Sequence, residues 1–177
     1  MDVPAVVVEY DPRWPTLFEA LCGRVRPAVA DIGAYIEHVG STAVPGLAAK
    51  PVIDMDVVVS AVGDVTPAIQ RLVAIGYTRQ GDLGVLGREA LDAPRDGPYH
   101  HLYVVVEGNQ AHCDHVDLRD YLRRHPDEAR RYAVRKHEIA PLLETDRTAY
   151  VLAKSDLVEE LLSRHWPTKR ISVRVPR

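Results

Sequence analysis

The segment from Val52 to Val59 constrains the fold of this chain more than any other part of the sequence. It reads V-I-D-M-D-V-V-V, a β-branched run that predicts a buried strand carrying Asp54 and Asp56. Residues two apart in a strand point to the same face, so the two carboxylates project together and their hydrophobic neighbours project to the other side. Buried unpaired charges cost several kcal/mol, on the order of the penalty for a desolvated ion. The carboxylates therefore need a compensating partner, unless this strand turns its acidic face to water.

Gly40-Ser41-Thr42 is the second informative feature, because it directly follows a run that predicts another strand. Gly40 lets the backbone turn sharply, and Ser41 and Thr42 place hydroxyl and N–H groups at the mouth of the turn. Such a turn can hold an anion. Mg²⁺ is commonly held by one or two carboxylates together with substrate phosphates. We therefore expect the turn to bind phosphate and Asp54 and Asp56 to bind Mg²⁺ or Mn²⁺.

The order of the expected elements predicts an α+β fold. Strands are expected at 5–10, 34–39, 52–59 and 99–107, helices at 14–30, 66–75, 116–124, 127–143 and 149–165, and a hairpin or mobile loop at 77–97. Strands dominate the first part and helices the second, which indicates a sheet with a helical layer behind it. We expect residues 1–110 to form an α/β core and residues 111–177 a helical portion packed on it, as one compact unit.

Composition narrows the classes of function. The net charge of −3 provides no general field that would attract long nucleic acid or a membrane surface, so any polyanion site must be a local basic pocket. This favours a small phosphorylated molecule as the substrate. The two cysteines give neither a disulfide framework nor a metal motif. The sequence shows no signal-peptide pattern and no apolar run of membrane-spanning length, so a cytoplasmic location is expected.

The combined pattern resembles the GrpB-like family of the nucleotidyltransferase superfamily, whose signature joins a Gly-Ser turn to a D-x-D strand. The matching segments are VEYDPRWP (8–15), HVGSTAVPGLAAKPVIDMDV (38–57), HHLYV (100–104), LRDYLRRHP (118–126), Tyr132 with Lys136, and Tyr150 with Ala153-Lys154. The resemblance implies a nucleotidyltransferase-like mixed sheet with helices packed on it and a C-terminal helical layer. It also implies a metal-bound nucleotide or phosphate, with either transfer or binding chemistry.

The chain departs from the superfamily pattern at the third carboxylate, which active members usually carry on a neighbouring strand. The expected strand at 99–107 presents His101 and Tyr103 on the facing side, with Glu107 near its end. The ordinary pKa of histidine lies near neutrality, so His101 could serve as the general base. It could equally be a metal ligand or a phosphate contact, or His100 and His101 could be ordinary structural histidines.

Basic side chains are expected to complete the phosphate site. Lys50 directly precedes the D-x-D strand and can reach a phosphate beside Ser41, while Arg119 and Lys154 lie on expected helices. Arginine suits a bidentate contact with phosphate, and lysine acts as a compact charge. We expect Lys50, Arg119 and Lys154 to bind phosphate.

Two other polar groups are expected to have structural roles. Solvated helix faces are expected for Arg123, Arg124, Arg130 and Arg131, with ion pairs four residues apart such as Asp120 with Arg124. The run His112-Cys113-Asp114-His115 has no second Cys/His pair at the spacing of a structural zinc site, so we expect a loop there that leads into the helix at 116.

The sequence thus predicts a metal-dependent nucleotidyltransferase that uses a nucleoside triphosphate and a small-molecule acceptor, with Asp54, Asp56 and His101 at the reacting centre. The alternative is a non-catalytic module that binds a nucleotide or a CoA-like phosphate. The missing third carboxylate favours this alternative, and GrpB-like domains also occur fused to dephospho-CoA kinase. The nucleotide, the acceptor and the oligomeric state are left open.

Overall fold

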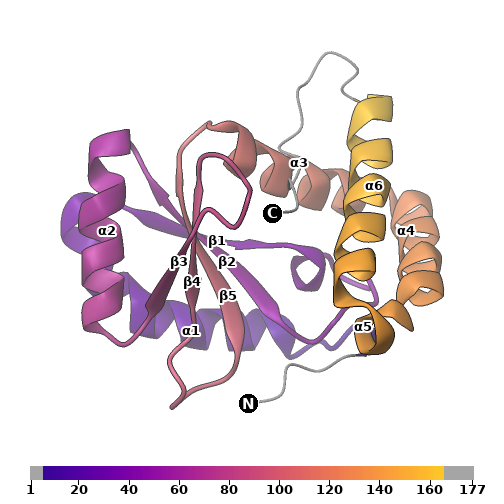
Figure 1. Ribbon diagram of the computed structural model, residues 1–177, viewed down its shortest axis with the longest axis horizontal. Coiled ribbons are helices and arrows are strands. Elements are labelled where there is room, and N and C mark those ends of the chain that lie inside the picture. Colours follow the sequence, from indigo (N-terminus) through magenta and orange to yellow (C-terminus); the bar gives the residue numbers. More distant parts are fainter. Residues whose placement is uncertain (1–5, 166–177) are drawn as a thin grey trace.

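The D-x-D segment forms β2 (Ile53–Val59), an interior strand of a mixed sheet in the computed structural model, which describes residues 6–165 (Figure 1). The other strands are β1 (Tyr35–Val39), β3 (Thr78–Gly81), β4 (Arg88–Asp92) and β5 (His100–Val106). Their order is β1-β2-β5-β4-β3, in which β2 and β5 are parallel and the other neighbours are antiparallel. The predicted mixed sheet with packed helices is confirmed.

Helices cover both faces of this sheet (Figure 1). One face packs against α1 (Trp14–Val29) and α2 (Val62–Ala74), and the other faces α3 (Gln110–Arg124). The layer beyond α3 consists of α4 (Pro126–Ile139), the short α5 (Leu142–Thr145) and α6 (Arg147–His165). Two 3₁₀ turns, η1 (Ala30–Ile32) and η2 (Ser41–Ala43), flank β1.

The alternation along β2 separates an apolar face from a polar one. Ile53, Met55 and Val57 are at most 1% exposed and belong to the main hydrophobic core under α1 and α2. Asp54 and Asp56 lie on the opposite face, as their spacing predicts, where they pair in register with His101 and Tyr103 of β5. The polar face of the sheet is therefore the one that faces α3.

A second, smaller core joins the segment between β1 and β2 to the helical layer. Val44 and Leu47 are each 1% exposed and pack with Tyr121, Tyr132 and Leu161 from α3, α4 and α6. The segment that carries the Gly40-Ser41 turn is thereby fixed to helices that are far away in the sequence.

Three sequence expectations are corrected by the structure. In place of a strand at 5–10, the described residues form a single bridge between Val8 and Ala49, because the partner segment lies between Pro45 and Pro51, which cannot donate hydrogen bonds. Helix α2 begins at Val62, four residues earlier than expected, and contains Pro67. Helix α3 begins at Gln110, so the expected loop at 112–115 is helical.

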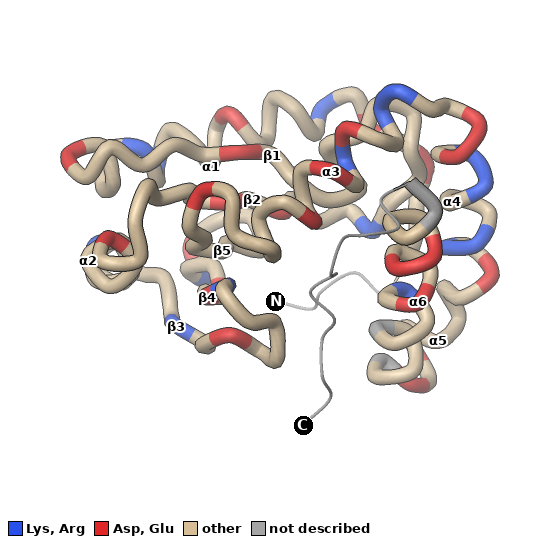
Figure 2. The backbone as a smooth tube through the Cα atoms, turned by 90° about the horizontal axis from the view of Figure 1, so that it is seen from above, with Lys and Arg blue, Asp and Glu red and all other residues tan. Residues whose placement is uncertain are grey.

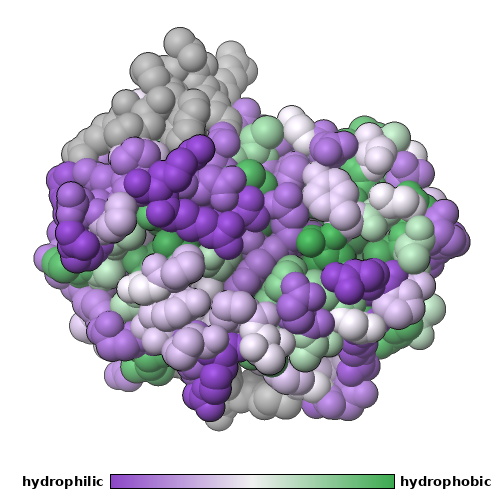
Figure 3. Space-filling view, turned by 180° about the vertical axis from the view of Figure 1, so that it is seen from behind, coloured by the Kyte–Doolittle hydropathy of each residue, from purple (hydrophilic) through white to green (hydrophobic). Residues whose placement is uncertain are grey.

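The surface of the helical layer carries charges of both signs. Blue and red segments alternate along α4 in Figure 2, where Arg130 pairs with Asp127 and Arg131 with Glu128. Seen from behind, hydrophilic side chains prevail and hydrophobic ones form small separate patches (Figure 3). Within residues 6–165, no helix combines the length and the apolar character that crossing a membrane requires.

Candidate functional site

A cavity of about 560 Å³ lies between the polar face of the sheet and the helical layer. Its walls include nearly all the residues predicted for the site: Gly40, Ser41, Thr42, Lys50, Asp54, His101, Arg119 and Lys154. Asp56 lies behind the wall, and its side chain is fully buried. The volume falls in the usual range for small-molecule sites.

Gly40 sits directly against Asp54 at the end of β1. Its backbone has φ 71° and ψ −170°, a region that essentially only glycine adopts. A Cβ atom at this position would lie 2.3 Å from Oδ2 of Asp54, which is far inside contact distance. Glycine is therefore required both for the sharp turn and for the approach of the turn to the carboxylate.

Asp54 forms a close pair with His101, its register partner on β5. The distance from Nδ1 of His101 to Oδ1 of Asp54 is 2.7 Å, and Nε2 of His101 lies 3.2 Å from the hydroxyl of Tyr99. Burial alone would raise the pKa of Asp54, but the hydrogen bond and charge of His101, with smaller effects of Lys154 and His115, lower it to about 2. Asp54 is thus an ionised carboxylate whose side chain is still 23% exposed at the cavity.

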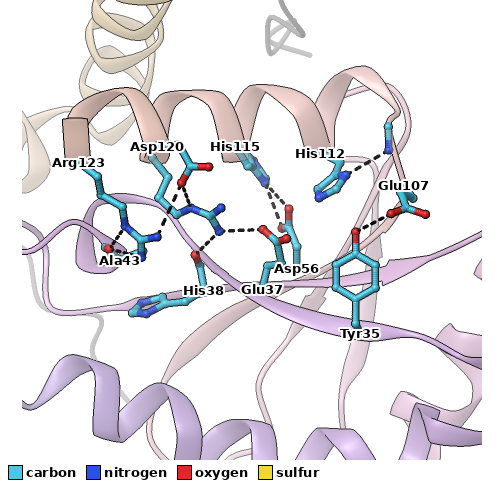
Figure 4. A network of polar contacts seen from close by, with 12 residues as sticks. Tyr35, Glu37, His38, Ala43, Asp56, Glu107, His112, His115, Asp120 and Arg123 are labelled. Atoms are coloured by element: carbon cyan, nitrogen blue, oxygen red, sulfur yellow. Dashed lines mark hydrogen bonds and ion pairs between the residues drawn. The ribbon is translucent and has the colours of Figure 1, made fainter. Parts of the chain in front are cut away.

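Asp56 is paired with His115 of α3 (Figure 4). Nδ1 of His115 lies 3.0 Å and 2.9 Å from the two carboxylate oxygens of Asp56. Burial opposes the charged form of His115, yet Asp56 raises the pKa of His115 above its ordinary value. The sequence analysis did not identify His115, because it expected a loop at this position.

The sequence signal that predicts a helix here is Asn109, a typical N-cap residue. Its side chain caps α3 by accepting from the backbone N–H of His112 at 2.9 Å.

Glu37 is a third carboxylate on this face that the sequence analysis did not identify. It lies directly opposite Asp56 on β1, not on β5 where the superfamily pattern would place such a group. Arg119 donates to Glu37 at 2.7 Å, to Asp120 at 2.7 Å and to the carbonyl of His38 at 3.1 Å. Arg119 therefore lines the cavity while anchored by two carboxylates, and its role in binding phosphate stays a prediction.

Arg123 holds the phosphate turn from behind. Its Nε and Nη2 donate to the carbonyl of Ala43 at 2.9 Å and 2.7 Å, which ties η2 to α3 (Figure 4). Arg123 is exposed, as expected of a solvated helix charge, but the local sequence could not show that it also contacts the turn. Thr42 in the same turn is 1% exposed, and its hydroxyl donates to the carbonyl of Val52 at 3.4 Å. Thr42 thus offers its backbone amide, more than its hydroxyl, to a ligand.

Two lysines of the helical layer face the same cavity. Lys136 is 1% exposed and donates from Nζ to the carbonyl of Ala48 at 2.6 Å. Burial, with a smaller effect from Lys154, lowers the pKa of Lys136 to about 7. The buried hydroxyl of Tyr132 lacks a hydrogen bond of good geometry among the described residues, although Ser41 is close enough to affect its pKa. This end of the cavity is therefore basic and rich in donors.

The donor set fits a metal ion that is shared with a ligand. Within residues 6–165, no three side chains of His, Cys, Asp or Glu are gathered closely enough to hold an ion by themselves. Asp54 nevertheless presents an ionised carboxylate beside a phosphate turn, and Mg²⁺ commonly completes its coordination with phosphate oxygens and water. Asp56 would contribute only if His115 turned away from it.

Comparison with known proteins supports this fold. A family model described as GrpB protein matches residues 4–164. UPF0157 protein PA4798 of Pseudomonas aeruginosa is 39% identical over 89% of this chain and 66% of that protein. UPF0157 protein YqkA of Bacillus subtilis is 31% identical over 93% of this chain and 48% of that protein. The chain therefore spans less than two thirds of the length of both relatives.

Solved structures give the same picture. The crystal structure of conserved protein GrpB from Enterococcus faecalis has a TM-score of 0.75 and 30% identity, and covers 91% of this chain and 99% of that chain. A structure of the Cid1 poly(U) polymerase with MgGTP bound has a TM-score of 0.50 and 16% identity over 73% of this chain and 42% of that chain, a likeness of fold alone. A dephospho-CoA kinase of Mycolicibacterium paratuberculosis is 24% identical over 92% of this chain and 46% of that protein. The expected nucleotidyltransferase-like fold is confirmed.

Proposed function

This chain belongs to the GrpB family, and on that premise we propose that it is a metal-dependent nucleotidyltransferase that acts on a small-molecule acceptor with a nucleoside triphosphate. One observation carries the proposal: the ionised carboxylate of Asp54 lies between the Gly40-Ser41 turn on one side and His101 on the other, within one cavity. Residues suited to bind phosphate, to ligate a metal and to act as a base are thus next to each other.

The substrate phosphates would lie at the basic end of the cavity. Ser41, the amides of its turn, Lys50 and Lys154 would bind the terminal phosphates of the nucleotide, with Arg119 at the side. Asp54, joined by Asp56, would hold Mg²⁺ or Mn²⁺, which when bound would neutralise charge on the phosphates. Fixed positive groups aimed at the reacting phosphate stabilise the charge that develops there.

His101 would act as the base. Because Asp54 is ionised, Nδ1 of His101 carries the proton of their hydrogen bond, and Nε2 is the acceptor, which faces the hydroxyl of Tyr99 at 3.2 Å. The acceptor hydroxyl would take the place of the Tyr99 hydroxyl at Nε2. Nε2 would take the proton of the acceptor hydroxyl while the acceptor oxygen bonds to the α-phosphorus and the bond to pyrophosphate breaks. This arrangement, a histidine oriented by an aspartate, is a common way to build a base.

A binding module is the second candidate. It is favoured by the pairing of both aspartates with histidines and by the likeness to a dephospho-CoA kinase, which handles a CoA precursor by its printed name. Such a module would bind a nucleotide or CoA-like phosphate at the same turn without transferring it.

Binding is tested by thermal unfolding of the wild type with each common nucleoside triphosphate and Mg²⁺. A ligand at 100 times its Kd should stabilise the fold by about 2.7 kcal/mol. Asp54→Asn should remove the metal-dependent part of that gain and leave the far-UV circular dichroism unchanged. A wild-type melting curve that no nucleotide shifts would contradict the transferase, and one that is also unmoved by CoA and dephospho-CoA would contradict the binding module.

Transfer is tested by pyrophosphate release in the presence of small hydroxyl acceptors. His101→Ala should slow release by roughly 10²–10⁴-fold with little change in nucleotide affinity. His137→Ala, which changes an exposed histidine of α4, is the matched control and should leave the rate unchanged. Nucleotide binding without pyrophosphate release from any acceptor would favour the binding module.

A further inference from the structure

Arg88 occupies the wall of the cavity on the far side of Asp54 from the phosphate turn. The sheet order places β1, with its turn, on one side of β2, and places β5 and then β4 on the other. Arg88 begins β4 and lines the cavity there, together with Tyr103 of β5. The cavity therefore has two positively charged ends, separated by Asp54 and His101.

The guanidinium of Arg88 differs from those of its neighbours in its partners. It stacks over the ring of Tyr103, with 4.3 Å between Cζ and the ring centroid, and its Nε is enclosed without a hydrogen-bond partner. Among the described residues, no acidic side chain lies within ion-pair distance of Arg88. By contrast, Arg79 on the adjacent β3 forms two hydrogen bonds with Glu89, at 2.8 Å and 2.9 Å. Stacking thus holds the Arg88 guanidinium in position, and its Nε–H lacks a hydrogen-bond partner among the described residues.

The geometry of in-line transfer determines whether the nucleotide or the acceptor binds at the Arg88 end of the cavity. In phosphoryl and nucleotidyl transfer the attacking and leaving oxygens lie on opposite sides of the phosphorus. With the leaving phosphates at the Ser41 turn, the acceptor must approach from the side of His101 and β4. Arg88 lies on that side.

We propose that Arg88, held by Tyr103, binds an anionic group of the acceptor, either a carboxylate or a phosphate. The assignment rests on the proposed function, since it uses the direction of the transfer. Arginine recognises both groups through two parallel N–H donors, and stacking on an aromatic ring orients its plane in advance.

The residues around Arg88 limit the position of the anionic group and favour an apolar body for the acceptor molecule. Asp92 also lines the cavity and lies opposite His101 on β4, so it repels an anion at that level and confines it to the Arg88 end. Tyr103 is two residues from His101 on β5, which separates the anion from the attacking hydroxyl by about 7 Å. Val85 and Leu83 of the β3–β4 hairpin add an apolar wall for the body of the acceptor.

The test is an NMR titration that follows the Nε–H signal of Arg88 with inorganic phosphate as one probe and acetate as the other. In the wild type we expect a saturable shift of this signal by at least one probe, and the stronger probe identifies the anion class. Arg88→Gln should weaken binding of that probe at this end at least tenfold, as followed by the backbone amides of Tyr103 and its neighbours. If Arg88→Gln fails to fold, Arg88→Lys replaces it, because lysine keeps the positive charge but lacks the two parallel N–H donors of arginine. Arg88→Lys should also weaken binding of the probe.

Two control variants separate this site from the phosphate turn. Arg79→Gln, an exposed arginine on the adjacent strand, and Ser41→Ala should both leave the Arg88 shift intact. A shift of the Tyr103 amide that is lost in Ser41→Ala but retained in Arg88→Gln, or no shift with either probe in the wild type, would overturn the proposal. The increase in melting temperature caused by nucleotide and Mg²⁺ should be the same in Arg88→Gln as in the wild type. If no nucleotide binds while the Arg88 shift persists, the proposed function fails and the anion site stands.

Discussion

Gly40 combines a backbone conformation reserved for glycine with a close approach to a functional carboxylate. Only glycine adopts this conformation without strain, and β1, the η2 turn and Asp54 surround the residue. The turn and the Asp54 carboxylate are therefore so close together that a side chain at position 40 would have no room, and the shape of the candidate site depends on glycine here.

Gly40→Ala should destabilise the fold and displace Asp54. The added Cβ would meet Oδ2 of Asp54 at 2.3 Å, so the cost should exceed the 1–3 kcal/mol or so expected for backbone strain alone. Gly33→Ala is the matched control, because Gly33 also has a positive φ, 68°, but its added Cβ would meet no atom within 4 Å. Urea unfolding measures both. Equal losses for the two variants would mean that the contact with Asp54 is unimportant.

His38 gives the protein a predictable sensitivity to acid. Its ring stacks on Phe18 with centroids 4.6 Å apart, Nε2 lies 3.0 Å from Oγ1 of Thr42, and burial lowers the pKa of His38 from 6.5 to about 4. Between these two pH values the folded state binds fewer protons than the unfolded state. The free energy of unfolding should therefore rise from pH 4 to pH 6.5, by at most about 3 kcal/mol from this group and by less because the ring is partly exposed.

His38→Gln tests this pH dependence. The variant should show a smaller increase in the free energy of unfolding between pH 4 and 6.5, measured by urea titration at several pH values. His137→Gln, at an exposed position of α4, should keep the wild-type slope. An unchanged slope in His38→Gln would assign the acid sensitivity to other groups.

At the scale of elements, α3 organises the polar face of the sheet. His115, Arg119 and Arg123 are spaced four residues apart and therefore share one side of the helix. They contact, in turn, Asp56 on β2, Glu37 on β1 and the carbonyl of Ala43 in η2. One helix thus fixes both the acidic strand and the phosphate turn.

Arg123→Ala should loosen the turn without disturbing the sheet. Loss of two charge-assisted hydrogen bonds to a carbonyl should cost on the order of 1–3 kcal/mol of unfolding free energy, and nucleotide affinity should fall as well. Arg124→Ala changes the exposed neighbour on the same helix and should stay within about 0.5 kcal/mol of the wild type. Chemical denaturation and nucleotide titration of both variants provide the measurements. A nucleotide affinity that is equal in the two variants would contradict the role of Arg123.

The sequence predicted those parts of the site that depend on local pattern. The alternation around Asp54 and Asp56, the turn at Gly40 and the candidate base His101 all follow from spacing within one segment. The pairing of Glu37 with Asp56 and the contact of Arg123 with Ala43 require knowledge of which elements lie side by side, so local pattern could not supply them. His115 was accessible in principle, because Gly108-Asn109 before an amphipathic run is a helix start signal that was not used.

At the scale of the whole molecule, two hydrophobic cores of unequal size stabilise the sheet and the helical layer that enclose the cavity. The larger lies between the sheet and α1 and α2, and the smaller joins Val44 and Leu47 to the helical layer. Local stability follows the extent of buried apolar contact, so the two parts should open separately. A ligand in the cavity touches both parts and should couple them.

Native-state hydrogen exchange should reveal this difference. Amides of α4 and α6 should exchange through openings that need less free energy than those of β2 and β5. A bound nucleotide with Mg²⁺ should slow exchange in α4 and α6 more than in the sheet. The matched comparison is Asp54→Asn under the same conditions, which should show little ligand-dependent slowing. Uniform exchange across both parts of the ligand-free protein would show that they unfold as one unit.

The alternation of side chains along β2 also restricts which mutations the chain can tolerate during evolution. The seven residues from Ile53 to Val59 alternate between the main hydrophobic core and the face of the sheet that meets α3, so inserting or deleting one codon there would exchange the two faces at once. Replacing a single codon at Asp54 or Asp56 leaves the packing of Ile53, Met55 and Val57 in place. Related proteins should therefore differ in β2 by substitutions and not by insertions or deletions. We expect insertions and deletions in the hairpin between β3 and β4 instead.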